Sequence, residues 1–448
     1  MIWLLKRSLL LCSLAPLACG QPSAMAQTVP AKPKETQNLL AAASKADITP
    51  AAHLLKPPFS KIHDPLFARV LVIESLGKRA VIGVLDVPMM STQVMGEMTQ
   101  AIAQYVKIPV EHVLLSASHT HNTYRLDRKQ GGIMLPGSSD YVDQVKAATM
   151  RALAQALDNL QPARAGSGQG SAHLTAPKSS WSAQHRRWIE KLDRSGAQSV
   201  DERVRVLTLE NLRGEPLAFL VNYGFNPVVA MALKDQVSGD VPGLAAIYIE
   251  QASSHGKVAP VALLTAGAAG NPLYRATDGD HERAGRLLNA MATILGEEVL
   301  AVSAETDKTQ SALPISAALA QVDCPGKTTT PLNLPDRCAH DTSSTLPPCD
   351  FKDSDAPPSS LRMGMLRLGD LAIVHSDADI TANVGKALQQ RSPLTQTWLA
   401  SLSYGPMHYI VADSEYPLAT YEATATTASQ GCAAGRFIDE ALSMLNAR

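Results

Sequence analysis

A histidine pair placed directly after an apolar run is the feature of this sequence best suited to chemistry. His119 and His121 belong to the run Ser118-His119-Thr120-His121, which follows the apolar segment 113–117. In extended backbone, residues i and i+2 project to the same face, so both imidazoles could converge on one metal ion. The alternative interpretation is a hydrogen-bonded histidine pair packed at the end of a strand.

Other polar residues stand where further strands are expected to end, and ligand sites of α/β proteins lie at such ends. These residues are Asn226 after 219–223, the run Ser238-Gly239-Asp240-Val241-Pro242-Gly243, the small residues of 266–271, Asp377 and Asp379 after 371–374, and His408-Tyr409 after 398–402. The run 238–243 predicts a tight turn, and the glycines of 266–271 let the backbone approach a neighbour closely. Each of these residues could equally be an ordinary turn residue or helix cap.

The elements that must position these residues are hairpins mixed with helices. Apolar runs around short turns predict three hairpins, at 69–74 with 80–86, 204–209 with 217–221, and 363–367 with 371–374. Further strands are predicted at 113–117 and 398–402, and helical spacing predicts helices over 91–106, 140–158, 280–303 and 433–446. The polar stretch 163–200 indicates no clear element. The mixture favours α+β or mixed-sheet α/β layering over a purely parallel doubly wound sheet.

Composition and the first residues indicate the compartment. The 448 residues carry a formal net charge of -1, and only 4% of them are aromatic. The sequence therefore shows neither the excess of basic residues nor the aromatic side chains that are typical of nucleic-acid-binding proteins. Lys6 and Arg7, a short apolar run and the small-residue site Ala24-Met25-Ala26 predict a signal peptide over 1–26. Residues 27–44 predict a flexible lead-in. No later segment is expected to span a membrane, so the mature protein should be secreted or periplasmic.

Four cysteines remain after cleavage at Ala26: Cys324, Cys338, Cys349 and Cys432. An even count in an oxidising compartment favours disulfides, and three of the four lie in the Pro-, Thr- and Asp-rich stretch 324–358. Disulfides there would cross-link a long surface loop and so restrict the unfolded chain. The alternative is a Cys/His metal site that uses His340, although its spacing matches no familiar zinc pattern. Four cysteines allow three pairings, which stay open at this point.

Taken in order, these segments resemble the catalytic N-terminal domain of the neutral/alkaline non-lysosomal ceramidase family. The motifs that carry the resemblance are Ala46-Asp47-Ile48-Thr49-Pro50, Asp64-Pro65-Leu66-Phe67-Ala68-Arg69, Ser118-His119-Thr120-His121, Val200-Asp201-Glu202, Ser238-Gly239-Asp240, Ala269-Gly270-Asn271, His408-Tyr409-Ile410, Glu415-Tyr416 and Tyr421-Glu422. The resemblance implies an α/β (mixed α+β) fold, with packed mixed β-sheets flanked by helices in a single catalytic-type domain over 45–448.

Members of that family bind one zinc ion through two histidines, a glutamate and a tyrosine. By resemblance, His119 is the first histidine ligand, Tyr409 is the tyrosine, Asp379 stands for the glutamate, and Asn226 stands for the second histidine. A carboxylate remains an acceptable zinc ligand, whereas an amide oxygen is a weak, neutral donor. The site is therefore expected to hold zinc less tightly, to take calcium or magnesium, to recruit His121, or to be empty.

The resemblance also implies a reaction. His121 would lie beside the reacting carbonyl and move the proton, and Tyr421 would contact the amide and steady the oxyanion. Leu273 stands where the family has a serine often assigned as nucleophile, but hydrolysis by a metal-activated water needs no serine. The expected function is an exported metal-dependent amide hydrolase acting on N-acylsphingosine or a related lipid or small-molecule amide. The alternatives are an inactive lipid- or small-ligand-binding relative and a purely structural exported protein.

Overall fold

The computed structural model describes residues 39–447, apart from 130–136, 178, 183–186, 191–199, 255–258, 271–280, 328–355, 402, 404 and 418–419. An eight-stranded sheet holds, in spatial order, β12 (Val261–Ala266), β10 (Pro216–Tyr223), β9 (Arg203–Asn211), β6 (Gln161–Ser171), β1 (Leu39–Asp47), β3 (Phe67–Ser75), β4 (Lys78–Leu85) and β5 (Val113–Ala117). A second sheet holds β13 (Ile315–Cys324), β14 (Ser359–Leu368), β15 (Leu371–Ser376) and β17 (Gln396–Ser401).

Short two-stranded ribbons and helices complete the described part. The ribbons pair β2 (Lys61–Ile62) with β11 (Gln236–Val237), β7 (Ser179–Ser182) with β8 (Arg187–Glu190), and β16 (Asp379–Ile380) with β18 (Tyr409–Ile410). The helices are α1 (Thr92–Val106), α2 (Ser139–Asp158), α3 (Asp240–Ala252), α4 (His281–Glu305), α5 (Ala382–Arg391), α6 (Tyr421–Ala425) and α7 (Ala433–Asn446).

Both large sheets are mixed, as the alternation of hairpins and helices predicted. The hairpins β3–β4, β9–β10 and β14–β15 are antiparallel, while β4–β5, β10–β12 and β15–β17 are parallel. Each parallel pair needs a crossover, and α1, α3 and α5 lie in those crossovers. The predicted fold class, packed mixed sheets flanked by helices, is confirmed.

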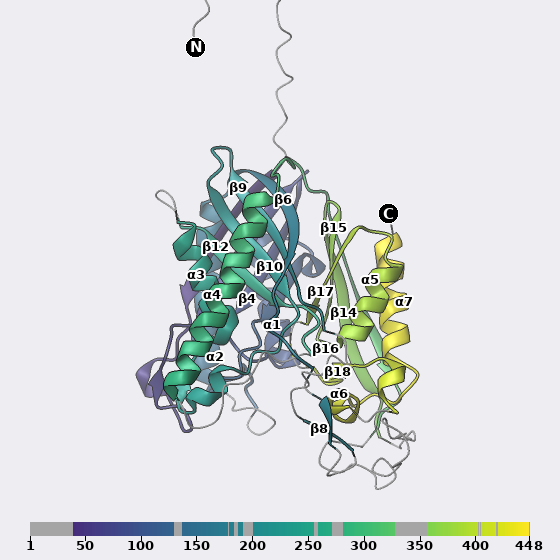
Figure 1. Ribbon diagram of the computed structural model, residues 1–448. Coiled ribbons are helices and arrows are strands. Elements are labelled where there is room, and N and C mark those ends of the chain that lie inside the picture. Colours follow the sequence, from purple (N-terminus) through teal and green to yellow (C-terminus); the bar gives the residue numbers. More distant parts are fainter. Residues whose placement is uncertain are drawn as a thin grey trace, which may run out of the picture. The chain divides into compact units, whose positions relative to one another are not determined.

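Alternate positions along the strands divide the core into layers. In β10, Leu220 faces a core shared with the second sheet, whereas Val221 faces a core shared with α3 and α4. In β15, Ile373 joins the shared core and Val374 lies under α5 and α7. The two sheets therefore pack face to face, and Figure 1 shows α3 and α4 beside one sheet and α5 and α7 beside the other.

The structure differs from the sequence-based expectations at three places. Residues 39–44, expected within the flexible lead-in, belong to β1, which pairs along its whole length with β3. In the polar stretch 163–200, for which no element was predicted, the first residues belong to β6, where a Cβ on Gly166 or Gly168 would come within 2.2 Å of Asp307 or Thr306 respectively. Small residues are therefore required where the chain after α4 crosses β6. The turn expected at 238–243 continues into α3.

Helix α4 has the length and apolarity of a membrane-crossing helix, contrary to the expectation that no later segment would. Its apolar residues Leu288, Leu295 and Val299 are fully buried in the core that it shares with α3 and the first sheet. This packing accounts for the apolar residues on the inner face of α4, whereas Ile294 on the same helix is 51% exposed.

Arg69, in β3 of the first sheet, lies between two buried carboxylates. Its Nη1 donates to Asp86 Oδ2 at 2.7 Å, and its Nε donates to Glu250 Oε1 at 3.0 Å. All three side chains are at most 4% exposed. Burial opposes charge on Arg69, but the two carboxylates outweigh it and raise the pKa of the guanidinium. The triad joins β3, the end of β4 and α3 through charge-assisted hydrogen bonds.

His375 in β15 makes the fold sensitive to acid. Burial lowers the pKa of its imidazole from 6.5 to about 4. Between these values an unfolded chain takes up a proton that the folded chain excludes, so stability falls as the pH falls from 6.5 towards 4. The wild type should therefore lose on the order of 3 kcal/mol of its free energy of unfolding through His375 as the pH falls over this range, and we expect His375→Gln to abolish this loss. Urea unfolding at pH 7 and pH 4.5 measures it, and equal pH dependence in both proteins would contradict the assignment.

Candidate metal and amide-hydrolysis site

The carboxyl ends of the parallel strands of the two sheets are tied together by buried polar side chains. Asn222, near the end of β10, donates from Nδ2 to the carbonyl of Leu399 in β17 at 2.7 Å. Ser401 at the end of β17 donates to the carbonyl of Gly267 after β12 at 2.9 Å. A Cβ on Gly267 would lie 3.2 Å from Asn222 Oδ1, so the close approach expected of the glycines in 266–271 is confirmed here.

His119 is held at the end of β5 by the backbone. Its N–H donates to the carbonyl of Val87 at 3.1 Å, and Ser118 donates to Leu85 at 2.8 Å. The extended geometry expected for 119–121 is wrong, because His119 has φ 68°. This left-handed conformation costs a non-glycine residue about 1–2 kcal/mol. Thr120 anchors the turn by donating to the carbonyl of Ser238 at 2.7 Å.

The turn brings His119 against both His121 and Asp379. The two imidazole rings stack, with centroids 5.4 Å apart and planes 19° apart. On its other side, His119 Nδ1 lies 3.6 Å from Asp379 Oδ1. His119 is 4% exposed and Asp379 is fully buried, whereas His121 is half-buried. The sequence-based expectation that both histidines lie at one site is therefore confirmed, although the backbone geometry differs.

Asp379 and Tyr409 are register partners in the parallel ribbon β16–β18. Asp379 N–H donates to the carbonyl of His408 at 2.8 Å, and Ile380 N–H donates to Ser401 Oγ at 3.1 Å. The second bond fixes β16 to the end of β17. Partner residues of two paired strands project from the same face, so the carboxylate and the phenol lie on one side of the ribbon.

Tyr421, at the start of α6, packs edge-on against Tyr409, with ring centroids 6.2 Å apart and planes at 84°. Thr420 caps the helix by accepting from Ala423 N–H at 3.3 Å. Thr426, just beyond α6, donates to the carbonyl of Tyr409 at 2.8 Å. The structure thus brings together His121, His119, Asp379, Tyr409 and Tyr421 as a continuous series of neighbours.

Asn226 lies three residues beyond β10 and is 4% exposed. Its Oδ1 has no hydrogen-bond partner among the described residues, and no hydrogen bond joins it to the five residues above. A buried amide oxygen without a donor is unusual, and Asn222 Oδ1 on the preceding strand shares this state. Leu273, the other departure from the family pattern, lies outside the described residues.

The neighbouring donors are the His119 imidazole, the buried Asp379 carboxylate and the Tyr409 phenol. With the amide oxygen that the resemblance assigns to Asn226, these donor types would suit a divalent cation with mixed nitrogen and oxygen ligands. Within the described ranges, no three His, Cys, Asp or Glu side chains group closely enough to hold a metal ion. A metal at this place would therefore depend on the phenol and the amide as well.

Two titratable residues to which the sequence analysis assigned no function, Glu415 and Lys327, lie beside the series that runs from His121 to Tyr421. Glu415 accepts from Thr381 Oγ1 at 3.1 Å and from Asn383 Nδ2 at 2.7 Å, and burial raises the pKa of its carboxyl. Lys327 donates from Nζ to the carbonyl of Thr424 in α6 at 3.1 Å, and burial lowers its pKa to about 7. Lys327 could not be found from the sequence because its surroundings come from α6, about a hundred residues away.

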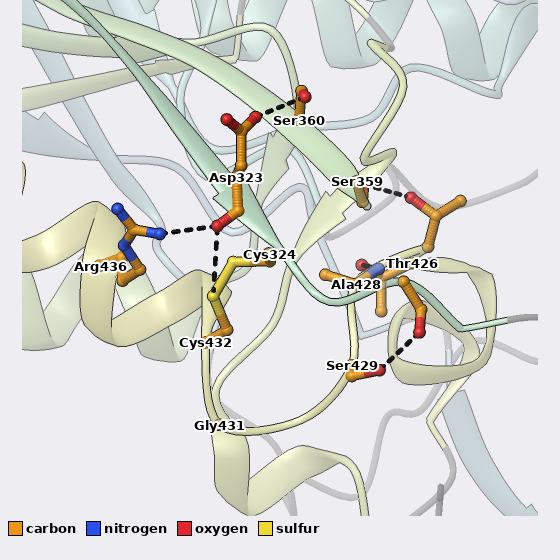
Figure 2. Close-up of a disulfide and its surroundings, with 12 residues drawn as sticks. Asp323, Cys324, Ser359, Ser360, Thr426, Ala428, Ser429, Gly431, Cys432 and Arg436 are labelled. Atoms are coloured by element: carbon orange, nitrogen blue, oxygen red, sulfur yellow. Dashed lines mark hydrogen bonds between the residues drawn. A yellow bond between two sulfur atoms is a disulfide. The ribbon is translucent and has the colours of Figure 1, made fainter. Parts of the chain in front are cut away.

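A disulfide fastens the segment that carries Lys327 to the segment that follows α6 (Figure 2). Cys324 at the end of β13 is bonded to Cys432 before α7, so disulfide formation is confirmed for this pair. Beyond the bond, Ser429 N–H donates to the carbonyl of Pro325 at 2.8 Å, and Ser429 Oγ donates to Gly326 at 2.8 Å. Cys338, Cys349 and His340, with any further disulfide or the alternative Cys/His metal site, lie outside the described residues.

Loss of the Cys324–Cys432 bond is expected to destabilise the protein by about 2–4 kcal/mol, because the bond restricts a long loop of the unfolded chain. The double variant Cys324→Ser/Cys432→Ser removes the bond, and Cys338→Ser/Cys349→Ser is the matched control that leaves it intact. Urea unfolding without reductant measures the difference. A double variant at 324 and 432 that unfolds at the wild-type midpoint would show that the bond adds no stability.

Comparison with known proteins agrees with this architecture. Residues 59–355 match the family model for neutral/alkaline non-lysosomal ceramidase, N-terminal. Neutral ceramidase from Pseudomonas aeruginosa superposes with a TM-score of 0.69 at 17% identity, covering 91% of this chain and 74% of that one. A ceramidase complexed with C2 gives 0.71 at 16% identity, covering 91% and 75%. No curated protein sequence gave a significant match.

The structural similarities establish a shared fold, and the family model covers well over half of the chain. The resemblance drawn from the sequence motifs is confirmed. This chain belongs to the neutral/alkaline non-lysosomal ceramidase family.

Proposed function

We propose that the protein is a metal-dependent hydrolase of N-acyl amides, with N-acylsphingosine or a related lipid amide as substrate. The observation that carries the proposal is the placement of His119 against both Asp379 and His121 at the joined strand ends. Family membership supports amide hydrolysis as the reaction class. The metal, the substrate and the residue roles below are parts of the proposal.

The proposed zinc ligands are His119, Asp379, Tyr409 and Asn226. Bound there, the ion supplies Lewis-acid polarisation of the amide carbonyl and a more acidic water. His121 takes the proton of the attacking water at an imidazole nitrogen and returns it to the departing amine. The Tyr421 hydroxyl donates a hydrogen bond to the developing oxyanion. The packing of Tyr421 on Tyr409 holds the phenol in place.

The direct test combines metal analysis with an amide hydrolysis assay. Purified full-length protein is analysed for bound metal, stripped with a chelator, and assayed with N-acylsphingosine and shorter N-acyl amides before and after zinc addition. We expect activity that the chelator removes and zinc restores. The absence of activity above background with zinc, calcium or magnesium would overturn the proposal.

Asn226→His is expected to tighten zinc binding by roughly 10–100-fold, because an imidazole replaces a neutral amide donor at the position of the family's second histidine. Competition with a zinc-binding dye measures the affinity. The control is Asn383→His, which places the same residue outside the proposed ligand set. Equal affinity in Asn226→His and the wild type would show that position 226 is not a ligand.

The second candidate function is binding of a lipid or small ligand without hydrolysis. The observation that favours it is the combined departure at two positions, Asn226 in place of the family's second histidine ligand and Leu273 in place of its serine. Metal content separates the two functions: one tightly held ion per chain supports hydrolysis, and an empty site with retained lipid binding supports the second candidate.

We also propose that the protein is exported to the periplasm or the medium after cleavage behind Ala26. The charged start, apolar run and small-residue site of 1–26 support this, as does a disulfide between Cys324 and Cys432. Mass spectrometry of the mature protein from fractionated cells tests it. A mature chain that retains Met1 in the cytoplasm would contradict it.

A further inference from the structure

A cavity of about 450 Å³ lies between α1, β5 and the second sheet. This volume falls within the range of small-molecule sites, roughly 300–1,000 Å³. Its wall is mainly apolar and includes Met95, Leu115 and Met363. None of the residues assigned above to the metal and amide-hydrolysis site lines it, so the cavity needs an explanation of its own.

His375 is a buried polar group in the wall of this cavity. Its side chain is 5% exposed and makes no hydrogen bond within the part of the chain that the structure describes. A neutral imidazole offers one donor and one acceptor, and with no protein partner among the described residues both are available to a molecule in the cavity. The His375 ring lies over Gly364, where a Cβ would come within 2.7 Å of the imidazole. The protein thus makes room for this ring beside the cavity.

Arg362 supplies a charged group to the same wall. Its Nε donates to Asp377 Oδ2 at 3.0 Å, and its backbone N–H donates to Asp377 Oδ1 at 3.0 Å. The Nη groups make no hydrogen bond to the described residues, and the Arg362 side chain is 40% exposed, so one edge of the guanidinium is open to solvent at the rim of the cavity. Arg69 in this chain binds carboxylates through both Nε and Nη1, which is the arrangement that Arg362 would complete with a second carboxylate.

We propose that this cavity binds an alkyl-chain carboxylate, with its carboxylate between Arg362 and His375 and its chain against Met95, Leu115 and Met363. The unbranched, polarisable methionine side chains adapt to a flexible alkyl chain. Asp377 is 4% exposed and already paired with Arg362, so the open donors of the wall favour an anionic head group. The hydrolysis proposed above would release such a molecule, but the cavity is inferred from its own residues.

Calorimetric titration of the full-length protein with dodecanoate, below its micelle concentration, tests the proposal. Gly96 of α1 lines the cavity, and no atom lies within 4 Å of a Cβ built there, so Gly96→Leu adds bulk at the cavity wall with no clash at its Cβ. Gly435→Leu in α7 is the matched control, because a Cβ on Gly435 also meets no atom within 4 Å and Gly435 does not line the cavity. We expect Gly96→Leu to weaken dodecanoate binding at least about 10-fold and Gly435→Leu to leave it unchanged.

The head group is tested with Arg362→Lys and with dodecan-1-ol. Lysine keeps a cation beside Asp377 but loses the second donor edge of the guanidinium. We expect Arg362→Lys to weaken dodecanoate binding about 10-fold and to leave weaker dodecanol binding unchanged. The proposal is overturned if the wild type does not bind dodecanoate, if both leucine variants bind it equally, or if dodecanol binds as tightly. Binding is measured without turnover, so these results are independent of whether the protein hydrolyses amides.

Discussion

Replacing His121 with glutamine is expected to lower kcat for amide hydrolysis about 10²–10⁴-fold, the usual contribution of a positioned general acid–base group. Glutamine keeps a polar side chain beside His119 but cannot exchange a proton near neutral pH. His121 stacks on His119 and is half-buried, so it can reach a substrate without being part of the buried His119–Asp379 pair. Bound metal, measured by elemental analysis, should therefore stay unchanged.

Two comparisons make this result specific. His53→Gln changes an exposed histidine outside the site and should leave both activity and metal content at wild-type values. Asp379→Asn should lower metal content and activity together, because it removes the charge of the buried carboxylate. If His121→Gln also loses the metal, His121 is a ligand; if it keeps full kcat, another group moves the proton.

Replacing Arg69 with methionine is expected to reduce the free energy of unfolding by about 3–5 kcal/mol, because it leaves a buried charge without its partner. Asp86 and Glu250 are both buried, and each keeps only part of its hydrogen bonding without the guanidinium. Burial already raises the pKa of Asp86. Urea unfolding at pH 7 measures the loss.

Arg79→Met is the matched control on the neighbouring strand. Arg79 pairs with Glu74, but both side chains are about a third exposed, and such surface pairs contribute roughly 0–1 kcal/mol. A similar loss in the two variants would show that the buried triad has no special role. A large loss for Arg69→Met alone would show that the triad holds β3, the end of β4 and α3 together.

The sequence predicts best where neighbouring residues determine the structure. The β3–β4 hairpin is predicted by two apolar runs on either side of the turn Leu76-Gly77. Both turn residues adopt positive φ. Helix α1 begins after Ser91, whose side chain accepts from Val94 N–H at 3.3 Å. These elements need only contacts a few residues apart, so propensity and turn chemistry suffice.

Long-range contacts account for the failures. β1 is rich in alanine and indicates no strand, yet nine residues pair with β3. The glycines of β6 remove the alternation that marks a strand, because the chain after α4 needs their space. In both cases the partner that stabilises the strand lies in another segment, and propensity within the strand is outweighed.

By itself, the sequence determined the family, the mixed fold class and the residue types at the strand ends. Tertiary structure alone decided how these residues meet. His119 reaches Asp379 because β4 and a left-handed turn hold it, and Asp379 reaches Tyr409 because β16 pairs with β18. It also decided which cysteines bond and placed His375 beside a cavity. These arrangements join segments that lie far apart in the chain, and only the packing of the two sheets supplies the contacts that offset the entropy of bringing them together.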